Sequence, residues 1–153
     1  MSEAPLDMNK EALIRLAKAC AETFGLEPTL VCAICEQESN WNPRATRFEP
    51  EFKLRYVDKL LLEEPEATYR ATSWGLMQLM GQTAREHGFQ DSLEQLLVPE
   101  IGLSWGCRFL ETRMTHAEDN VTKALLLWNG GSNEEYPNQV LARVKNYEES
   151  ESV

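Results

Sequence analysis

One glutamate stands out as a possible acid catalyst because of where the sequence places it. The helical segment that begins near Leu30 is apolar and runs into Glu38, and Pro43 then ends the helix. A carboxyl group at the end of a buried helix is partly removed from water, which raises its pKa and lets it act as a general acid in glycoside cleavage. Glu36 lies two residues away, on a different face, and we expect it to point elsewhere.

The type of reaction depends on whether a second carboxylate lies near Glu38. An inverting hydrolase places a second carboxylate about 6.5–9.5 Å from the acid, where it activates water. The candidates are Glu49, Glu51 and Asp58, although exposed loop charges are the simpler interpretation of all three. They fall in the long segment 46–72, which we expect to form one wall of a groove and to bring Glu49 or a tyrosine close to Glu38. A carboxylate nearby would raise the pKa of Glu38 further.

The hydrophobic pattern predicts helices nearly throughout, so we expect an all-α fold. Helical segments are predicted at 13–24, 28–38, 52–62, 74–87, 99–114, 121–128 and 137–147. Gly25 ends the first helix and Pro28 begins the second, while Ser92 begins a capping box for a further short helix. Segment 121–128 is apolar almost all round, which predicts that it is the central buried helix.

Length and composition bound the class of protein. The chain has 153 residues, of which 42% are hydrophobic and 26% charged, which is typical of one folded domain. We expect a catalytic domain over 1–153, with frayed ends at 1–8 and 148–153. The net charge of −10 argues against nucleic acid as a partner. No apolar run is long enough to span a membrane, and no signal peptide is visible. The alternatives are a phage-encoded protein, export by another route, or a signal that has been removed.

The four cysteines have a structural interpretation. Cys32 and Cys35 lie three apart on a predicted helix among apolar residues, which is typical of small core-filling side chains. A zinc site would need two further ligands, and the two histidines show no paired spacing. We therefore expect neither a metal nor another cofactor. A disulfide among these residues, Cys20 and Cys107 remains an open alternative.

Three short blocks occur in a fixed order along the chain. Residues 38–45 read Glu-Ser-Asn-Trp-Asn-Pro-Arg-Ala, residues 73–80 read Ser-Trp-Gly-Leu-Met-Gln-Leu-Met, and residues 124–131 read Ala-Leu-Leu-Leu-Trp-Asn-Gly-Gly. Together they resemble the motifs of the soluble lytic transglycosylases of glycoside hydrolase family 23, which share the goose-type lysozyme fold. The resemblance extends over most of the chain, from Leu13 to Val144. It implies a lysozyme-like helical domain that cleaves peptidoglycan.

The resemblance also implies roles for single residues. Glu38 would be the general acid and then the general base, without a second carboxylate. The substrate-binding residues would be Ser39, Gly75, Leu76, Met77, Gln78, Trp128, Asn129 and Tyr136. Among these, Gln78 would hydrogen-bond the substrate and Asn129 would hold an N-acetylated sugar. The MurNAc–GlcNAc β-1,4 bond would be cleaved and the sugar's own 6-hydroxyl would trap the cation, which gives a 1,6-anhydro product.

The chain departs from the family pattern in three places. Trp128 stands where the family has tyrosine, so a phenol that could bond the catalytic glutamate is missing there. The tyrosines that could replace it are Tyr56, Tyr69 and Tyr136. A Gln-Val pair at 139–140 takes the place of Tyr-Val, and segment 46–72 is longer than usual. Flat faces for sugar rings could come from Trp41, Trp74 and Trp128, unless these side chains are simply core.

Three functions are compatible with the sequence. The first is a monomeric lytic transglycosylase that acts on peptidoglycan glycan strands in the periplasm or outside the cell. The second is a hydrolase of the same fold, of lysozyme or chitinase type, that uses a second carboxylate such as Glu49. The third is a catalytically silent wall-binding module, against which an intact Glu38, Gln78 and Asn129 argue. The net charge of −10 is unfavourable for work on an anionic wall.

Overall fold

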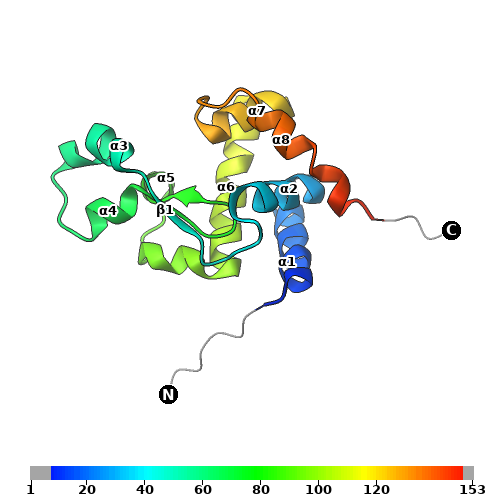
Figure 1. Cartoon of the computed structure of the whole chain (residues 1–153), viewed down its shortest axis with the longest axis horizontal. Coiled ribbons are helices and arrows are strands. Elements are labelled where there is room, and N and C mark those ends of the chain that lie inside the picture. The colour runs from blue at the N-terminus through cyan, green and yellow to red at the C-terminus, as the bar shows by residue number, and fades with distance from the viewer. Residues whose placement is uncertain (1–7, 150–153) are drawn as a thin grey trace, which may run out of the picture.

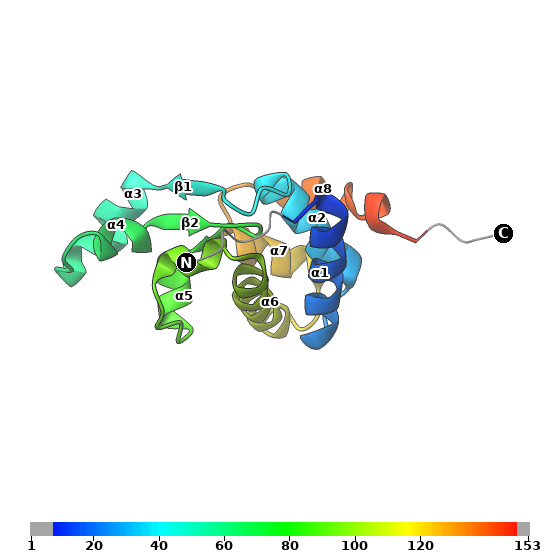
Figure 2. The same ribbon diagram turned by 90° about the horizontal axis from the view of Figure 1, so that it is seen from below.

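The structure is a computed structural model that describes residues 8–149. Helix α6 (Pro99–His116) runs through the middle of the molecule. Helices α1 (Lys10–Thr23) and α2 (Pro28–Ser39) lie on one side of α6, and a small sheet with several short helices lies on the other (Figure 1, and turned in Figure 2). This arrangement confirms the predicted all-α class. The ends predicted to fray, 1–8 and 148–153, fall almost entirely outside the described residues.

Most helices begin and end where the sequence predicts. Pro28 and Pro99 stand in the first turns of α2 and α6, and Gly25 and Gly130 follow the ends of α1 and α7 with φ of 70° and 83°. The other elements are β1 (Thr46–Phe48), α3 (Pro50–Phe52), the π-helix η1 (Lys53–Val57), η2 (Asp58–Leu60), α4 (Glu66–Arg70), β2 (Thr72–Trp74), β3 (Leu79–Met80), α5 (Gly81–Glu86), η3 (Leu93–Leu97), α7 (Val121–Asn129), α8 (Tyr136–Leu141) and η4 (Val144–Tyr147). No helix within residues 8–149 is long and apolar enough to cross a membrane.

The central buried helix is α2. Its residues 30–35 are all buried, and it packs against α1, α8 and η4. The prediction that segment 121–128 takes this position is wrong. Only Ala124 and Leu125 of α7 are buried, and Leu127 is 38% exposed, because part of this apolar helix lines a groove instead of the core.

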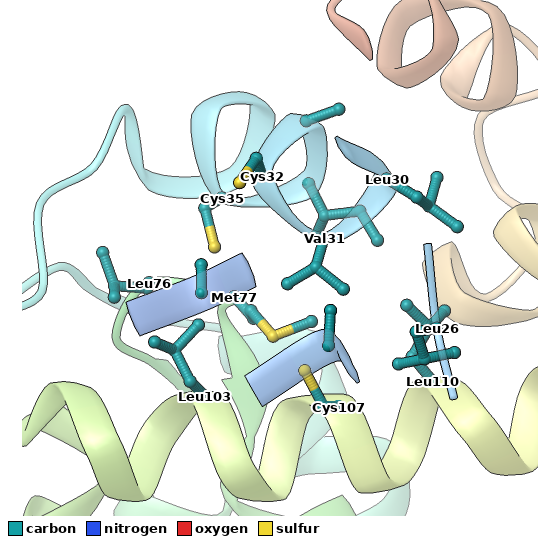
Figure 3. Packing of buried hydrophobic residues seen from close by; sticks show 14 of the residues in the cluster. Leu26, Leu30, Val31, Cys32, Cys35, Leu76, Met77, Leu103, Cys107 and Leu110 are labelled. Atoms are coloured by element: carbon teal, nitrogen blue, oxygen red, sulfur yellow. The ribbon is translucent and has the colours of Figure 1, made fainter. Parts of the chain in front are cut away.

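The main core lies between α2 and α6, and side chains from the loop after β2 fill it (Figure 3). Leu76 and Met77 of that loop are each 1% exposed. Cys32, Cys35 and Cys107 are fully buried in the same core as free thiols, which confirms that Cys32 and Cys35 are core-filling residues. The cluster ties α2, α6 and the loop into one packed unit, so the end of α2 has a fixed position relative to the loop.

The start of the region predicted as a helix over 74–87 belongs instead to a three-stranded antiparallel sheet, through the end of β2 and through β3. Strand β2 pairs with β1 on one side and with β3 on the other, and Arg47 lies opposite Ser73. The chain cannot be helical between β2 and β3 because Gly75 and Gln78 have φ of 76° and 51°. Only α5, at the end of the predicted segment, is helical.

Segment 46–72 is folded rather than an open loop. Strand β1 joins the sheet, and the helix predicted at 52–62 is present as α3, η1 and η2. Helix α4 has no counterpart among the predicted helices. The segment has a small core of its own, made of Val57, Ala67 and Ala71. It lies at the end of the molecule farthest from α1 (Figure 1).

Two details of the remaining helices differ from the prediction. The side chain of Ser92 makes no capping hydrogen bond, so the capping box is wrong, although the short helix η3 follows it. In the last helical region, predicted over 137–147, Val140 and Tyr147 are buried and Leu141 is 39% exposed. The prediction has one continuous helix here, but the structure divides it into α8 and η4 after Leu141.

Candidate active site

The last turn of α2 presents Glu38 to a groove. The helix ends at Ser39, and Asn40 then turns the chain with a left-handed φ of 49°. The Ser39 hydroxyl lies 2.9 Å from the carbonyl oxygen of Cys35 and 2.8 Å from that of Leu76, so its single proton is shared between them. Ser39 therefore fixes the end of α2 to the loop after β2, and it is not one of the groove-lining residues.

Two donors from the C-terminal part of the chain hold the carboxyl group of Glu38. Tyr136, at the start of α8, donates its hydroxyl proton to Oε2 of Glu38 in a short hydrogen bond, and Trp128 of α7 donates its indole N–H. Burial raises the pKa of Glu38, and these two bonds and the charge of Arg47 offset only part of the increase. Of the three tyrosines that the sequence offers, Tyr136 is the one that bonds Glu38.

Tyr136 itself stays protonated. Burial and the neighbouring Glu38 raise the pKa of Tyr136 far above its ordinary value. It is 3% exposed, so it lies beneath the groove rather than on its surface. The phenol is therefore a permanent donor to Glu38 and not an acid or base in its own right.

The groove beside Glu38 has a volume of about 670 Å³. Residues 47–56 line it from one part of the chain, which confirms that segment 46–72 forms a wall. Residues of α6 and α7 line it from another part, and they include Phe109, Leu127, Trp128 and Asn129. The groove is thus assembled from segments that are more than fifty residues apart in the sequence.

Gln78 is the one residue of the 75–78 loop that lines the groove. Its amide nitrogen donates to the carbonyl oxygens of Ala45 and Gly75, both at 3.0 Å. Its carbonyl oxygen accepts no hydrogen bond from the residues that the structure describes. The amide is therefore held in one orientation, with its acceptor available to a ligand.

The rest of this loop does not face the groove. Leu76 and Met77 lie in the core, so the expectation that their side chains bind substrate is wrong (Figure 3). A Cβ at Gly75 would lie 2.6 Å from the carbonyl oxygen of Leu96, so this glycine allows a close approach of protein backbone and not of a ligand.

Trp128 is the only one of the three candidate tryptophans that lines the groove. Trp41 and Trp74 are each 5% exposed. The indole N–H of Trp41 donates to the hydroxyl of Tyr147 at 2.7 Å, and that of Trp74 donates to the carbonyl oxygen of Tyr69 at 3.0 Å. Both are core residues with satisfied donors, and neither can stack on a sugar.

The second carboxylate is present in the groove but is paired. Glu49 lines the groove and forms an ion pair with Arg47, with 2.9 Å between Oε1 and Nε. Glu51 also lines the groove, whereas Asp58 pairs with a neighbouring lysine and does not. No carboxylate is among the described groups that shift the pKa of Glu38, so the expectation that Glu49 raises it is wrong.

Glu36 points away from the groove, as predicted. Its carboxylate accepts hydrogen bonds from Arg143, from the Tyr147 hydroxyl at 2.5 Å and from Asn146 at 3.4 Å. Burial raises the pKa of Glu36, but these donors together lower it by more. The network fastens the chain after α8 to α2, and α8 is the helix that carries Tyr136.

Three arginines of the groove escaped the sequence analysis: Arg47, Arg55 and Arg113. Arg47 reaches the groove through the pairing of β1 with β2, and strands this short leave no pattern in the sequence. Arg113 lies four residues after Phe109 and therefore on the same face of α6. This spacing could predict that Arg113 lines the groove only if Phe109 were already known to line it.

A second hollow, of about 460 Å³, surrounds Arg85 and shares no lining residue with the groove. Its charges satisfy one another, since Arg85 bonds the carboxylate of Glu66 and the carbonyl oxygens of Phe89 and Asp91. No group of His, Cys, Asp or Glu within residues 8–149 is arranged to hold a metal ion. The groove at Glu38 is therefore the candidate active site.

A helical fold with a half-buried, protonatable carboxyl group at the edge of a groove is the arrangement that a lysozyme-like catalytic domain requires. The comparison with protein families agrees with this class. The model of the transglycosylase SLT domain matches residues 15–151, so the chain belongs to that family and is a peptidoglycan lytic transglycosylase. No solved structure was found to match the chain.

Proposed function

We propose that this enzyme cleaves the β-1,4 bond between MurNAc and GlcNAc and releases a 1,6-anhydro product, with Glu38 as general acid and then general base. The observation that supports this most directly is the raised pKa of Glu38 at the groove, which keeps a proton available for the leaving oxygen. Tyr136 and Trp128 bond the same carboxyl group, so its orientation is fixed.

The proposed reaction needs one carboxyl group. Protonated Glu38 gives its proton to the glycosidic oxygen while the bond from that oxygen to C1 breaks, and the leaving sugar departs as an alcohol. The acetamido oxygen of the remaining sugar stabilises the cation at C1. The 6-hydroxyl oxygen then bonds to C1 while ionised Glu38 takes its proton, which closes the anhydro ring and restores the acid. Between the two steps, Tyr136 and Trp128 stabilise the carboxylate.

The groove supplies polar groups for the sugars. The side-chain nitrogen of Asn129 is buried and has no partner within the described residues, and we infer that it donates to an N-acetyl carbonyl oxygen. The free carbonyl oxygen of Gln78 would accept from a sugar hydroxyl or amide. We further propose that 1–153 is a single catalytic domain that acts as a monomer, in the periplasm or outside the cell, where its polymeric substrate lies.

The second candidate is a hydrolase of the same fold. The presence of Glu49 in the groove favours it, because an inverting mechanism needs a carboxylate to activate water. The ion pair with Arg47 argues against it, since this pair would have to open before Glu49 could take a proton from water. A silent wall-binding module is disfavoured, because binding alone does not explain why a half-buried Glu38 has a raised pKa beside the groove.

The test is replacement of Glu38 by Gln, followed by assay on purified cell walls and analysis of the products by mass spectrometry. We expect a loss of at least about 10²–10⁴-fold in turnover, because an amide can neither give nor recover a proton. The wild-type products should be lighter by one water than those of a lysozyme.

The matched control is Glu36→Gln, which removes a carboxylate two residues away that faces the other side of α2. We expect its activity to stay within a few-fold of wild type when circular dichroism shows an intact fold. Retention of more than about a tenth of wild-type activity by Glu38→Gln would mean that another group is the acid.

A further inference from the structure

Two buried side-chain donors within residues 8–149 have no hydrogen-bond partner, and both belong to residues that line the groove. They are Nε of Arg113 and Nδ2 of Asn129. An unpaired buried donor is unfavourable for folding, so such groups are rare unless a ligand completes them. The amide of Asn129 already has a place in the proposed reaction, whereas Arg113 has none.

Stacking holds Arg113 in position. Its guanidinium carbon lies 4.4 Å from the centre of the Phe109 ring, and that ring lies 5.3 Å from the ring of Trp128. No carboxylate within residues 8–149 forms an ion pair with Arg113. The guanidinium is thus oriented by aromatic rings and keeps its donors for another partner.

Arg113 does not act on the carboxyl group of Glu38. The cation that lowers the pKa of Glu38 is Arg47, and Arg113 is not among the groups that shift it. A guanidinium in a groove binds a carboxylate most strongly, because two parallel N–H donors match the two oxygens. The sugar rings of a glycan strand are neutral. In peptidoglycan the carboxylates lie on the lactyl group of the muramyl sugar or on the peptide that extends from it.

The charges of the groove fit such a group. Three arginines and no lysine line it, together with three glutamates, of which Glu38 holds its proton more strongly than an exposed carboxyl would. The groove is therefore close to neutral, whereas the whole chain carries −10. An anionic substrate that most of the surface repels can be accepted here.

We propose that Arg113 binds a carboxylate of the substrate, carried by the lactyl group or by the attached peptide, and makes the enzyme prefer such strands to a neutral glycan. This inference rests on the proposed function of the groove. It gives the enzyme a determinant of specificity on α6, separate from the residues that act on the glycosidic bond.

The test compares Arg113→Gln with Arg108→Gln. Arg108 lies on the same helix and also stacks on an aromatic ring, 4.8 Å from the centre of Trp105, but it does not line the groove. Three substrates are needed: strands that carry peptides, strands stripped of peptides by an amidase so that the lactyl carboxylate is free, and a neutral chitooligosaccharide. Binding is measured in the Glu38→Gln background through tryptophan fluorescence, so the result does not depend on turnover.

We expect Arg113→Gln to weaken binding about 10- to 100-fold for a strand that carries the recognised carboxylate, the effect of losing a charge-assisted pair. Binding of chitooligosaccharide should not change, and Arg108→Gln should bind all three like the parent. A loss confined to peptide-bearing strands assigns the carboxylate to the peptide, and one confined to stripped strands assigns it to the lactyl group. In the active enzyme the change should appear in KM, with kcat within about threefold.

Two outcomes would overturn the inference. Equal weakening on all three substrates would show that Arg113 only supports Phe109 and Trp128, and unchanged binding of both carboxylate-bearing strands would show that it binds no carboxylate. Arg113→Lys should recover part of the affinity and of its dependence on salt if charge recognition is involved. If Glu38→Gln keeps its activity, the proposed mechanism fails, but these binding results still decide the role of Arg113.

Discussion

The carboxyl groups of Glu38 and Glu36 are two positions apart, yet their surroundings move their pKa values in opposite directions. Burial dominates at Glu38 and raises its pKa, although two donors and Arg47 act against the increase. At Glu36 burial also raises the pKa, but donors that include Tyr147 and Arg143 outweigh it. The face of the helix therefore decides which glutamate can be an acid and which is an anchor.

The hydroxyl of Tyr136 should affect the alkaline limit of activity through the pKa of Glu38. Its hydrogen bond lowers the pKa of Glu38, so Tyr136→Phe should raise that pKa and move the alkaline limb of the kcat/KM profile to higher pH. The ionised form of Glu38 also loses a donor, and we expect kcat to fall about tenfold. A pH profile on solubilised glycan strands measures both effects.

The control for this variant is Tyr147→Phe, which removes a phenol from the carboxylate of Glu36 on the other side of α2. Its pH profile should match that of wild type. An alkaline limb that stays in place in Tyr136→Phe, or moves to lower pH, would contradict the role given to this hydrogen bond.

Glu49 distinguishes the two enzymatic mechanisms. Because it is paired with Arg47 and is absent from the groups that act on Glu38, we expect Glu49→Gln to stay within about threefold of wild type and to give the same anhydro products. Mass spectrometry of the products and a rate measurement decide this. A loss of about 10²-fold or more, with hydrated products from the wild type, would support a hydrolase instead.

At the scale of elements, Glu38 is positioned by a junction between a helix and a loop. The end of α2 is bound through Ser39 to the loop between β2 and β3, and Leu76 and Met77 anchor this loop in the core. The same loop carries Gln78 into the groove. A change that shifts the loop should therefore affect both stability and turnover, even where it touches no substrate.

Gly75→Ala tests this coupling, with Gly25→Ala as its matched control. Both glycines have positive φ, 76° and 70°, but a Cβ at Gly75 would meet the carbonyl oxygen of Leu96 at 2.6 Å, whereas one at Gly25 meets nothing within 4 Å. We expect Gly25→Ala to lower the free energy of unfolding by about 1 kcal/mol and to leave kcat unchanged.

For Gly75→Ala we expect a larger loss, about 2–3 kcal/mol, and a fall in kcat of about tenfold or more as Gln78 and Ser39 move. Urea denaturation and steady-state rates measure the two quantities. Equal effects of the two variants on stability, with normal turnover in both, would show that the loop does not position the site.

The sequence predicts a helix or strand well where its pattern of apolar residues has a single structural explanation. Helices α2 and α6 follow from apolar spacing with a proline in the first turn, and both are found. The pattern fails for α7, because apolar residues that line a groove have the same spacing as residues that fill a core. It also fails for β2 and β3, which are too short to show alternation and depend on the positive φ of Gly75 and Gln78.

The site shows the same division. Glu38, Trp128 and Asn129 lie in sequence blocks that resemble a known family, and the structure brings all three to one groove. The interactions of Arg47 and Arg113 could not be predicted, because they depend on the pairing of strands and on the packing of aromatic rings between distant segments. The local sequence shows neither the strand pairing nor the aromatic packing.

For the whole molecule, the raised pKa of Glu38 has a cost in stability. A carboxyl group with a higher pKa in the folded state than in the unfolded state favours folding only while it is protonated. The stability that protonated Glu38 contributes is fully present below the pKa of this group in the unfolded protein, about 4.3. It is lost as the pH rises through the pKa of Glu38 in the folded protein. Above that range the folded protein holds an unfavourable buried charge.

Replacement of Glu38 by Gln should therefore stabilise the fold at neutral and alkaline pH. We expect a Tm about 1–3 °C above that of wild type there, and no difference below about pH 4, where both proteins are neutral at this position. Thermal melts followed by circular dichroism across this pH range test the prediction. A difference that grows toward acid pH would mean that the pKa of Glu38 is lowered by folding.

The hydrogen bond between Tyr136 and Glu38 joins residues that are 98 positions apart. A ribosome releases Glu38 well before Tyr136, because chains emerge from the N-terminus. The nascent chain can form α1 and α2 while it still lacks both the phenol and the indole that hold the acid. Translation order therefore delays the assembly of the surroundings of Glu38 until α7 and the start of α8 have been made.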